Sequence, residues 1–187
     1  MVSIFSLWLP IILSAVVVFI VSSIVHMVFS YHKSDFKKLP DENRALNELG
    51  KLNIPQGDYA FPHSTDMKER KSQEFKDKMN KGPVGILTAF PSGETGMGSS
   101  LIQWFIYSVI VGIFAAYITG HALGAGMPYL SVFRYAGCTA FAGYSLALMT
   151  DSIWFKRSWS TTFKFMFDGL IYALFTAGVF GWLWPMS

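Results

Sequence analysis

The sequence predicts an all-α polytopic membrane protein, a four-transmembrane-helix bundle with a partly helical cytoplasmic loop. The first observation is composition: hydrophobic residues make up 52% of the chain and charged residues only 14%. The second is the placement of charge, because 11 of the 15 Lys and Arg residues lie between Lys33 and Lys81. Similarly, 10 of the 12 Asp and Glu residues lie between Asp35 and Glu94. This pattern excludes a soluble globular domain and a wholly disordered chain.

Four apolar stretches are each long enough to cross roughly 30 Å of hydrocarbon as a helix. The first occupies residues 1–30. The other three lie within a three-helix region, residues 101–187, at about 101–121, 129–149 and 165–184. A cleaved signal peptide is the alternative for the first stretch. That alternative fits poorly, because no basic residue precedes the apolar run and the run is too long.

Basic residues near the ends of these stretches predict their orientation. They follow the first stretch and separate the third from the fourth, at Lys33, Lys37, Lys38, Arg44, Lys156, Arg157 and Lys164. Residues 121–128 and both termini carry no Lys or Arg. Because positive residues accumulate on the cytoplasmic side, we expect both termini outside and the 31–100 loop in the cytoplasm.

The 31–100 loop is expected to contain short amphipathic helices. Residues 40–49 predict one, with a proline in the first turn, early acidic residues and a glycine at the end. Residues 66–80 predict another, suited to a membrane surface or a partner. The apolar run at 84–91 is too short to span and predicts a strand or a buried segment. Residues 92–100 are rich in Gly and Ser and predict a flexible connection.

Small residues recur at every fourth position in the second and fourth stretches. The stripe positions are Gly112, Ala116, Gly120, Gly124, Gly169, Ala173, Ala177 and Gly181. Residues four apart share one helix face, and small side chains there let two backbones approach closely. Packing of the four helices within one chain is the favoured interpretation. The alternative is that one stripe faces a second copy or another membrane subunit.

A polar site is predicted inside the membrane from His26, Gln103, Tyr107, Tyr144, Arg134 and Asp168. An ionisable side chain costs about 2.5–3.5 kcal/mol at a helix centre on insertion scales, so such residues point to function. His26 and Asp168 are expected at the same depth, about one turn from the cytoplasmic face, and His26 is the expected partner of Asp168. The pair is either a structural hydrogen bond or a proton relay. Arg134 lies toward the outer face, where it either snorkels or points inward.

No catalytic motif is visible, and neither catalytic, cofactor-binding nor metal-binding residues are predicted. His32 and His63 look like isolated loop residues, without the spacing of a zinc site. Cys138, in the third stretch, is interpreted as a small packing residue. We therefore expect a protein that is not an enzyme.

Five segments resemble a family of small bacterial four-helix inner-membrane proteins whose activity is uncharacterised. The segments are Tyr31–Asp35, Lys38–Glu42, Gly82–Leu87, Asp151–Trp154 and Asp168–Pro185. The resemblance spans nearly the whole chain and implies a bacterial inner-membrane location. It implies no activity.

The function expected from the sequence is that of a non-enzymatic accessory or structural subunit of a membrane complex, or of a self-associating bundle. The alternative is a minimal oligomeric transporter or channel, or a proton-conducting element, that uses the inner His/Asp polar layer. The expected partners are the lipid bilayer and other membrane subunits or copies of the same chain. Neither nucleic acid nor a cofactor is expected.

The orientation can be tested by labelling cysteines from outside the cell. A cysteine placed at Ser187 should be labelled and one placed at Ser72 should not, because the charge asymmetry puts these positions on opposite sides. The reverse labelling pattern would overturn the predicted orientation.

Overall fold

The computed structural model describes residues 1–93 and 96–186. Glu94 and Thr95, in the predicted flexible connection, and Ser187, the site chosen for labelling, lie outside the described residues. The chain divides into two units. Met1–Phe36 and Met97–Ser187 form the first, called here the helical unit, and Lys37–Gly96 forms the second, the loop unit.

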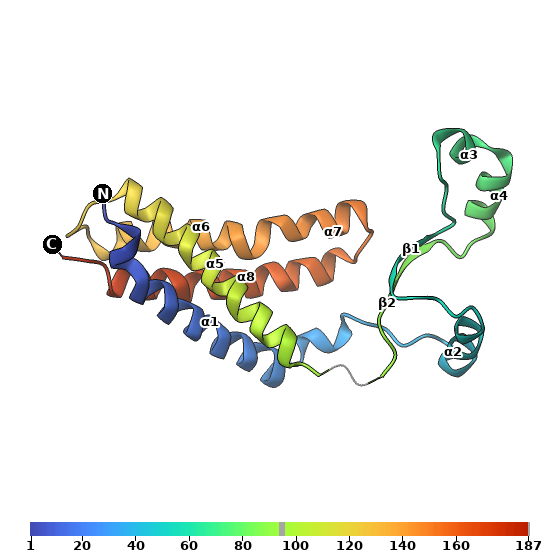
Figure 1. The fold of residues 1–187 in the computed structure, drawn as a ribbon, viewed down its shortest axis with the longest axis horizontal. Helices are drawn as coiled ribbons and strands as arrows, with labels where there is room; N and C mark the ends of the chain where they lie inside the picture. The colour runs from blue at the N-terminus through green and yellow to red at the C-terminus, as the bar shows by residue number, and fades with distance from the viewer. Residues whose placement is uncertain (94–95, 187) are drawn as a thin grey trace. The chain divides into compact units, whose positions relative to one another are not determined.

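In the described part of the chain, the helical unit is built from four long helices and four short helical turns. Its elements are η1 (Ile4–Leu7), α1 (Trp8–Val28), η2 (Tyr31–Ser34), α5 (Gly98–Ala122), α6 (Tyr129–Ser145), η3 (Leu146–Leu148), α7 (Met149–Trp154) and α8 (Trp159–Trp182). The long helices α1, α5, α6 and α8 lie side by side, and α6 and α8 make the most extensive contact (Figure 1). Leu7, Val132 and Phe180 are fully buried among them.

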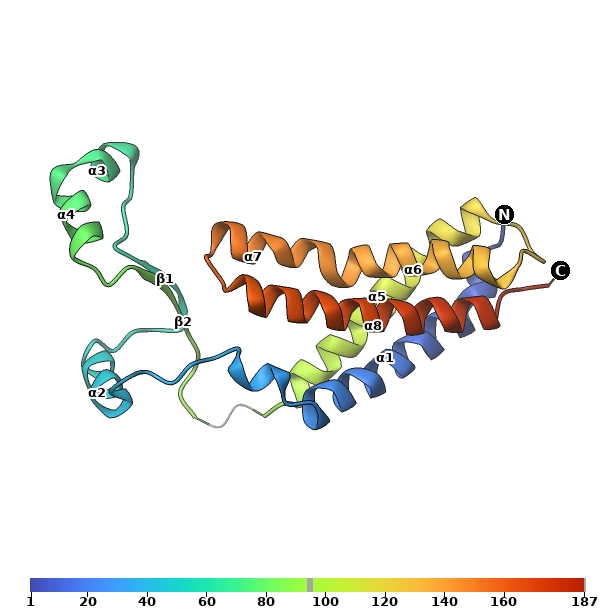
Figure 2. The same ribbon diagram turned by 180° about the vertical axis from the view of Figure 1, so that it is seen from behind.

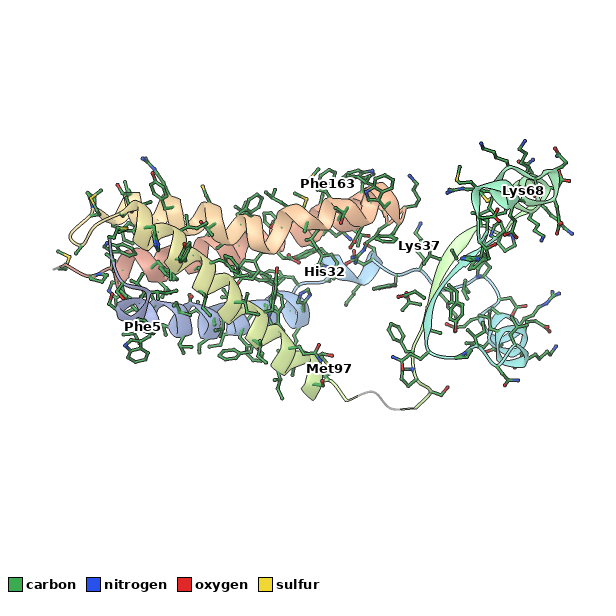
Figure 3. All side chains as sticks on the ribbon, turned by 45° about the horizontal axis from the view of Figure 1, so that its top comes forward. Phe5, His32, Lys37, Lys68, Met97 and Phe163 are labelled. Carbon is green, nitrogen blue, oxygen red and sulfur yellow. The ribbon has the colours of Figure 1, made fainter. Side chains whose placement is uncertain are left out.

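Both chain termini lie at the same end of the helical unit, called the termini end (Figure 2). Backbone hydrogen bonds connect the segments there: Val2 N–H donates to the Gly120 carbonyl at 2.8 Å, and Gly126 N–H to the Pro185 carbonyl at 2.9 Å. Phe5 marks this end, and His32 lies at the opposite end (Figure 3). Successive long helices run in opposite directions; short connections join α5, α6 and α8, whereas the loop unit separates α1 from α5.

Three helices in the described part of the chain are long and apolar enough to cross a membrane: Ile4–Val28, Gly98–Ala122 and Trp159–Trp182. The third predicted stretch, 129–149, does not form one helix of spanning length, because α6 has only 17 residues. Its backbone leaves α-helical geometry at Ser145 (φ −127°, ψ −45°). There the Ser145 hydroxyl donates to the Met166 carbonyl at 3.2 Å. A protein with membrane-spanning helices is thus supported, although α-helical geometry in the third stretch is interrupted at Ser145, before the predicted end at 149.

The last long helix begins earlier than the predicted start at 165. α8 starts at Trp159, after Ser158, and includes Lys164 in its second turn. The difference matters because Lys164 and Asp168, four residues apart, now share one helix face.

The small-residue stripes face neighbouring helices of the same chain. A Cβ atom added at Gly112 would lie 3.3 Å from the Ile11 carbonyl, and one at Gly181 would lie 2.6 Å from the Tyr129 ring. The remaining helical positions of the stripes are buried: Ala116, Gly120, Gly169, Ala173 and Ala177. Gly124 is an exception, since it lies beyond the end of α5 and its carbonyl accepts from Trp184 Nε1 at 2.9 Å.

The described residues of the loop unit form three short helices and one pair of strands. Its elements are α2 (Glu42–Lys51), β1 (Gly57–Phe61), α3 (Met67–Lys71), α4 (Gln73–Lys81) and β2 (Gly85–Ala89). β1 and β2 are antiparallel, with Gly57 opposite Ala89 and Phe61 opposite Gly85. None of the described residues of this unit is buried.

The helices and strands of the loop unit agree only in part with those predicted from the sequence. The helix expected at 40–49 is present but continues through Gly50. The helix expected at 66–80 is divided at Ser72, whose extended backbone (ψ 153°) and hydroxyl cap the start of α4. The run at 84–91 forms strand β2, and its partner β1 was not expected from the sequence.

The contact between α5 and the chain start predicts a large effect at Gly120. A Cβ there would lie 2.7 Å from the Val2 carbonyl oxygen, so Gly120→Ala should lower the free energy of unfolding in detergent by about 1–3 kcal/mol. The matched control is Gly98→Ala, because nothing lies within 4 Å of a Cβ at that position. Equal thermal unfolding of the two variants would contradict the close contact.

Candidate functional site

The candidate site lies at the end of the helical unit opposite the termini, where η2 meets α8. Each element contributes two ionisable side chains on one face. His32 and Asp35 are three residues apart at the η2 turn, and Lys164 and Asp168 are four apart on α8. Together with Tyr31 these residues form what we call the ionic cluster.

Asp168 is the most buried charged group of the cluster, with 1% of its surface exposed. The Tyr31 hydroxyl donates to Oδ1 of Asp168, and His32 Nε2 lies 2.8 Å from Oδ2. Burial raises the pKa of the Tyr31 hydroxyl, and its hydrogen bond to Asp168 raises it further. Tyr31 therefore keeps its proton and remains a donor to the carboxylate.

Asp35 connects His32 to Lys164. Its Oδ2 lies 2.6 Å from His32 Nδ1, and its Oδ1 lies 2.8 Å from Lys164 Nζ. Burial acts to raise the pKa of Asp35, but the hydrogen bonds from Lys164 and His32 outweigh it and lower the pKa. Lys164 also donates to the Tyr31 carbonyl and the Ser34 hydroxyl, each at 2.7 Å. All three ammonium hydrogens thus have an acceptor.

The hydrogen-bond pattern constrains the charge of His32. An ionised carboxylate only accepts hydrogen bonds, and His32 has one carboxylate at each ring nitrogen. When Asp35 and Asp168 are both ionised, both ring nitrogens donate and the imidazole is positively charged. Two negative and two positive groups then balance within the ionic cluster, which reduces the cost of burying each of them.

His26 lies beside the ionic cluster. Its ring centroid is 4.7 Å from that of His32, and Phe165 packs 4.9 Å from His32. The ligand atoms of His26, His32 and Asp168 all lie within 4.8 Å of one another. Two imidazoles and one carboxylate at such distances can hold a metal ion.

The structure separates the predicted polar site into distinct parts. Asp168 is in the ionic cluster, but its hydrogen-bond partners are His32 and Tyr31, and the expected partner His26 instead stacks on His32. Arg134 is exposed on α6 and Gln103 is exposed on α5.

Tyr107 and Tyr144 belong to a separate aromatic group. Its members are Trp104, Tyr107, Tyr144 and Tyr172, with neighbouring ring centroids 5.6–6.1 Å apart. Trp104 Nε1 donates to the Ser22 hydroxyl at 2.9 Å, and the Tyr107 hydroxyl to the Gly143 carbonyl at 2.6 Å. Cys138 is exposed and does not pack inside the unit.

Sequence reasoning missed Tyr31, His32, Asp35 and Lys164 as site residues. The only sign in the sequence was the spacing of two pairs of ionisable residues. His32 and Asp35 are three residues apart, and Lys164 and Asp168 are four apart at the start of the last predicted stretch. This sign was hidden because residues 31–35 read as a loop and Lys164 was placed outside the helix.

Family models, curated proteins and solved structures were compared with this chain, and none of the three comparisons finds a match.

Replacing Asp168 should show how far the ionic cluster stabilises the fold. Asp168→Leu leaves the Tyr31 hydroxyl and His32 Nε2 without their partner, and each unpaired buried group costs about 1–3 kcal/mol. Asp168→Asn should cost less, because its amide oxygen still accepts from Tyr31 and its amide nitrogen can donate to a neutral His32. Thermal unfolding in detergent measures both.

The matched control is Asp151→Asn. Asp151 lies 3.6 Å from Arg157 in a partly exposed pair, so its loss should change the free energy of unfolding by less than about 1 kcal/mol. If Asp168→Leu is as mild as this control, the ionic cluster does not stabilise the fold.

Proposed function

We propose that the chain is a small integral-membrane protein that carries a cation across the bilayer, with Asp168 as the group that receives the cation. The buried carboxylate of Asp168, on a helix long enough to span, is the observation that supports this proposal most strongly. Ionisable groups at such positions are retained mainly for ion pathways and relays. Once a cation has displaced the proton between His32 Nε2 and Asp168 Oδ2, the ionic cluster holds two carboxylates against one positive Lys164, and this net negative charge favours the bound cation.

The helical unit also contains buried hydroxyl groups outside the ionic cluster. Ser14, Ser108 and Thr176 each donate to a carbonyl three or four residues earlier in their own helix. A hydroxyl oxygen that donates its proton can also accept a hydrogen bond or coordinate a cation. The Tyr172 hydroxyl, one turn along α8 from Asp168, is buried and has no hydrogen-bond partner among the described residues. Oxygen atoms inside an apolar bundle are the ligands a cation needs after it leaves water.

The accessory-subunit function remains a prediction that rests on the small-residue stripes. The helical positions of these stripes contact other helices of the same chain, so they offer less support for a second subunit than the sequence suggested. The ionic cluster is not needed for such a role. We therefore place the transport function first.

The proposal includes four membrane crossings. The third crossing consists of α6, η3 and α7, which together run from residue 129 to 154, and its irregular part lies against α8, within the protein. Both termini are then outside, and the ionic cluster faces the cytoplasm in a bacterial inner membrane.

Transport can be measured with the full-length protein reconstituted in liposomes that contain a fluorescent indicator. Protons, K⁺ and Zn²⁺ are tested separately, and at least one should enter faster than in protein-free liposomes. Asp168→Asn should lower that rate at least about tenfold, the effect of about 1.4 kcal/mol on a barrier, because it removes the negative charge. Asp151→Asn should retain the rate.

Two results would contradict the proposal. One is that none of the three cations enters faster than in protein-free liposomes. The other is that Asp168→Asn transports as well as the unmodified protein while remaining folded.

A further inference from the structure

We propose that His26, His32 and Asp168 form a binding site for a divalent transition-metal ion, with Zn²⁺ as the representative ion. The inference rests on the proposed function only in that it names the cation carried. The site itself stands on the geometry of the three side chains.

The ligand set fits such an ion. Two imidazole nitrogens and one carboxylate oxygen are typical of zinc sites that keep a fourth position open, and of non-haem iron sites. Two ligand atoms bound to one zinc ion lie at most about 4.2 Å apart, because each is about 2.1 Å from the metal. The ligand atoms here lie within 4.8 Å of one another, so the side chains must approach one another by about 0.6 Å or more to bind one ion. Mg²⁺ and Ca²⁺ favour sites made of oxygen atoms and fit poorly.

The groups around the ligands are already in place. Asp35 Oδ2 holds Nδ1 of His32 at 2.6 Å, which turns the other ring nitrogen, Nε2, toward Asp168. Tyr31 donates to Oδ1 of Asp168 and leaves Oδ2 for the metal. Metal-binding histidines and carboxylates commonly have such second partners, which fix their orientation.

Metal binding would replace one contact only, the hydrogen bond between His32 Nε2 and Asp168 Oδ2. The proton that they share is released to water as the ion takes its place, since metal ligands must be deprotonated. The contacts of Asp35 with Lys164 and His32, and of Tyr31 with Asp168, are retained.

His26 separates this proposal from a purely structural role of the ionic cluster. It makes no hydrogen bond among the described residues and its side chain is exposed, so it adds little to the stability of the fold. If the ionic cluster only stabilised the fold, it would require Tyr31, His32, Asp35, Lys164 and Asp168 but not the imidazole of His26. A metal site needs it as the third ligand.

The test uses the full-length protein, purified in detergent, freed of metal with a chelator and titrated with ZnCl₂ in a calorimeter. We expect one Zn²⁺ per chain and no comparable heat from MgCl₂. His26→Ala should weaken Zn²⁺ binding at least about tenfold without lowering the melting temperature of the metal-free protein. Asp35→Asn should weaken it about 10–100-fold, as loss of a group that orients a ligand does.

The matched control is His121→Ala. His121 is an exposed histidine of the same helical unit, and its Nδ1 lies 2.8 Å from the Tyr117 carbonyl on α5, away from the three ligands. His121→Ala should bind Zn²⁺ as the unmodified protein does.

The metal site is overturned if the unmodified protein takes up no Zn²⁺, or if His26→Ala binds it within twofold of normal affinity. These outcomes are independent of the transport measurement. Transport of protons or K⁺ without Zn²⁺ binding would leave the proposed function and remove the metal site. Zn²⁺ binding that depends on His26, without transport of any cation, would leave the metal site and remove the transport function.

Discussion

A carboxylate buried on an apolar helix requires hydrogen-bond donors around it, and this requirement determines the structure at one end of the helical unit. Asp168 lies on α8 and is almost completely buried. Its oxygen atoms are met by Tyr31 and His32, which come from the short turn that follows α1. Those two residues are in turn fixed by Asp35 and Lys164. The path of the chain directly after α1 is therefore fixed by two side chains of α8, Asp168 and Lys164.

The same arrangement explains where the helical unit stops. The last residue of its first segment is Phe36, directly after Asp35. Up to that point the chain is held by hydrogen bonds to α8, and beyond it the loop unit begins. The loop unit has no buried side chain among its described residues and is organised by one strand pair and by local caps such as Ser72. Regions with so little buried apolar surface open more readily than packed helices.

The helices could be predicted from sequence because their signal is local, a long apolar run that needs no knowledge of neighbours. The small-residue stripes were informative for a similar reason, since spacing alone defines a helix face. What could not be predicted depends on contacts between distant segments. The irregular backbone at Ser145 accompanies a bond to Met166 on another helix, and β1 is a strand only because β2 pairs with it. His32 was overlooked because five residues after a helix carry no sign that they fold back onto α8.

Different kinds of hydrogen bond hold the chain at the two ends of the helical unit. Amino-acid substitutions therefore affect the two ends differently. At the termini end, the bonds between Val2 and Gly120 and between Gly126 and Pro185 join backbone atoms, which every amino acid except proline supplies as a donor. At the other end, the bonds join side chains, and single substitutions can remove, reverse or retune them. A substitution of Val2 retains the main-chain hydrogen bond to Gly120, provided that Gly120 itself stays small. We therefore expect substitutions that change chemical specificity at the end that contains Asp168, while the main-chain bonds of the opposite end persist.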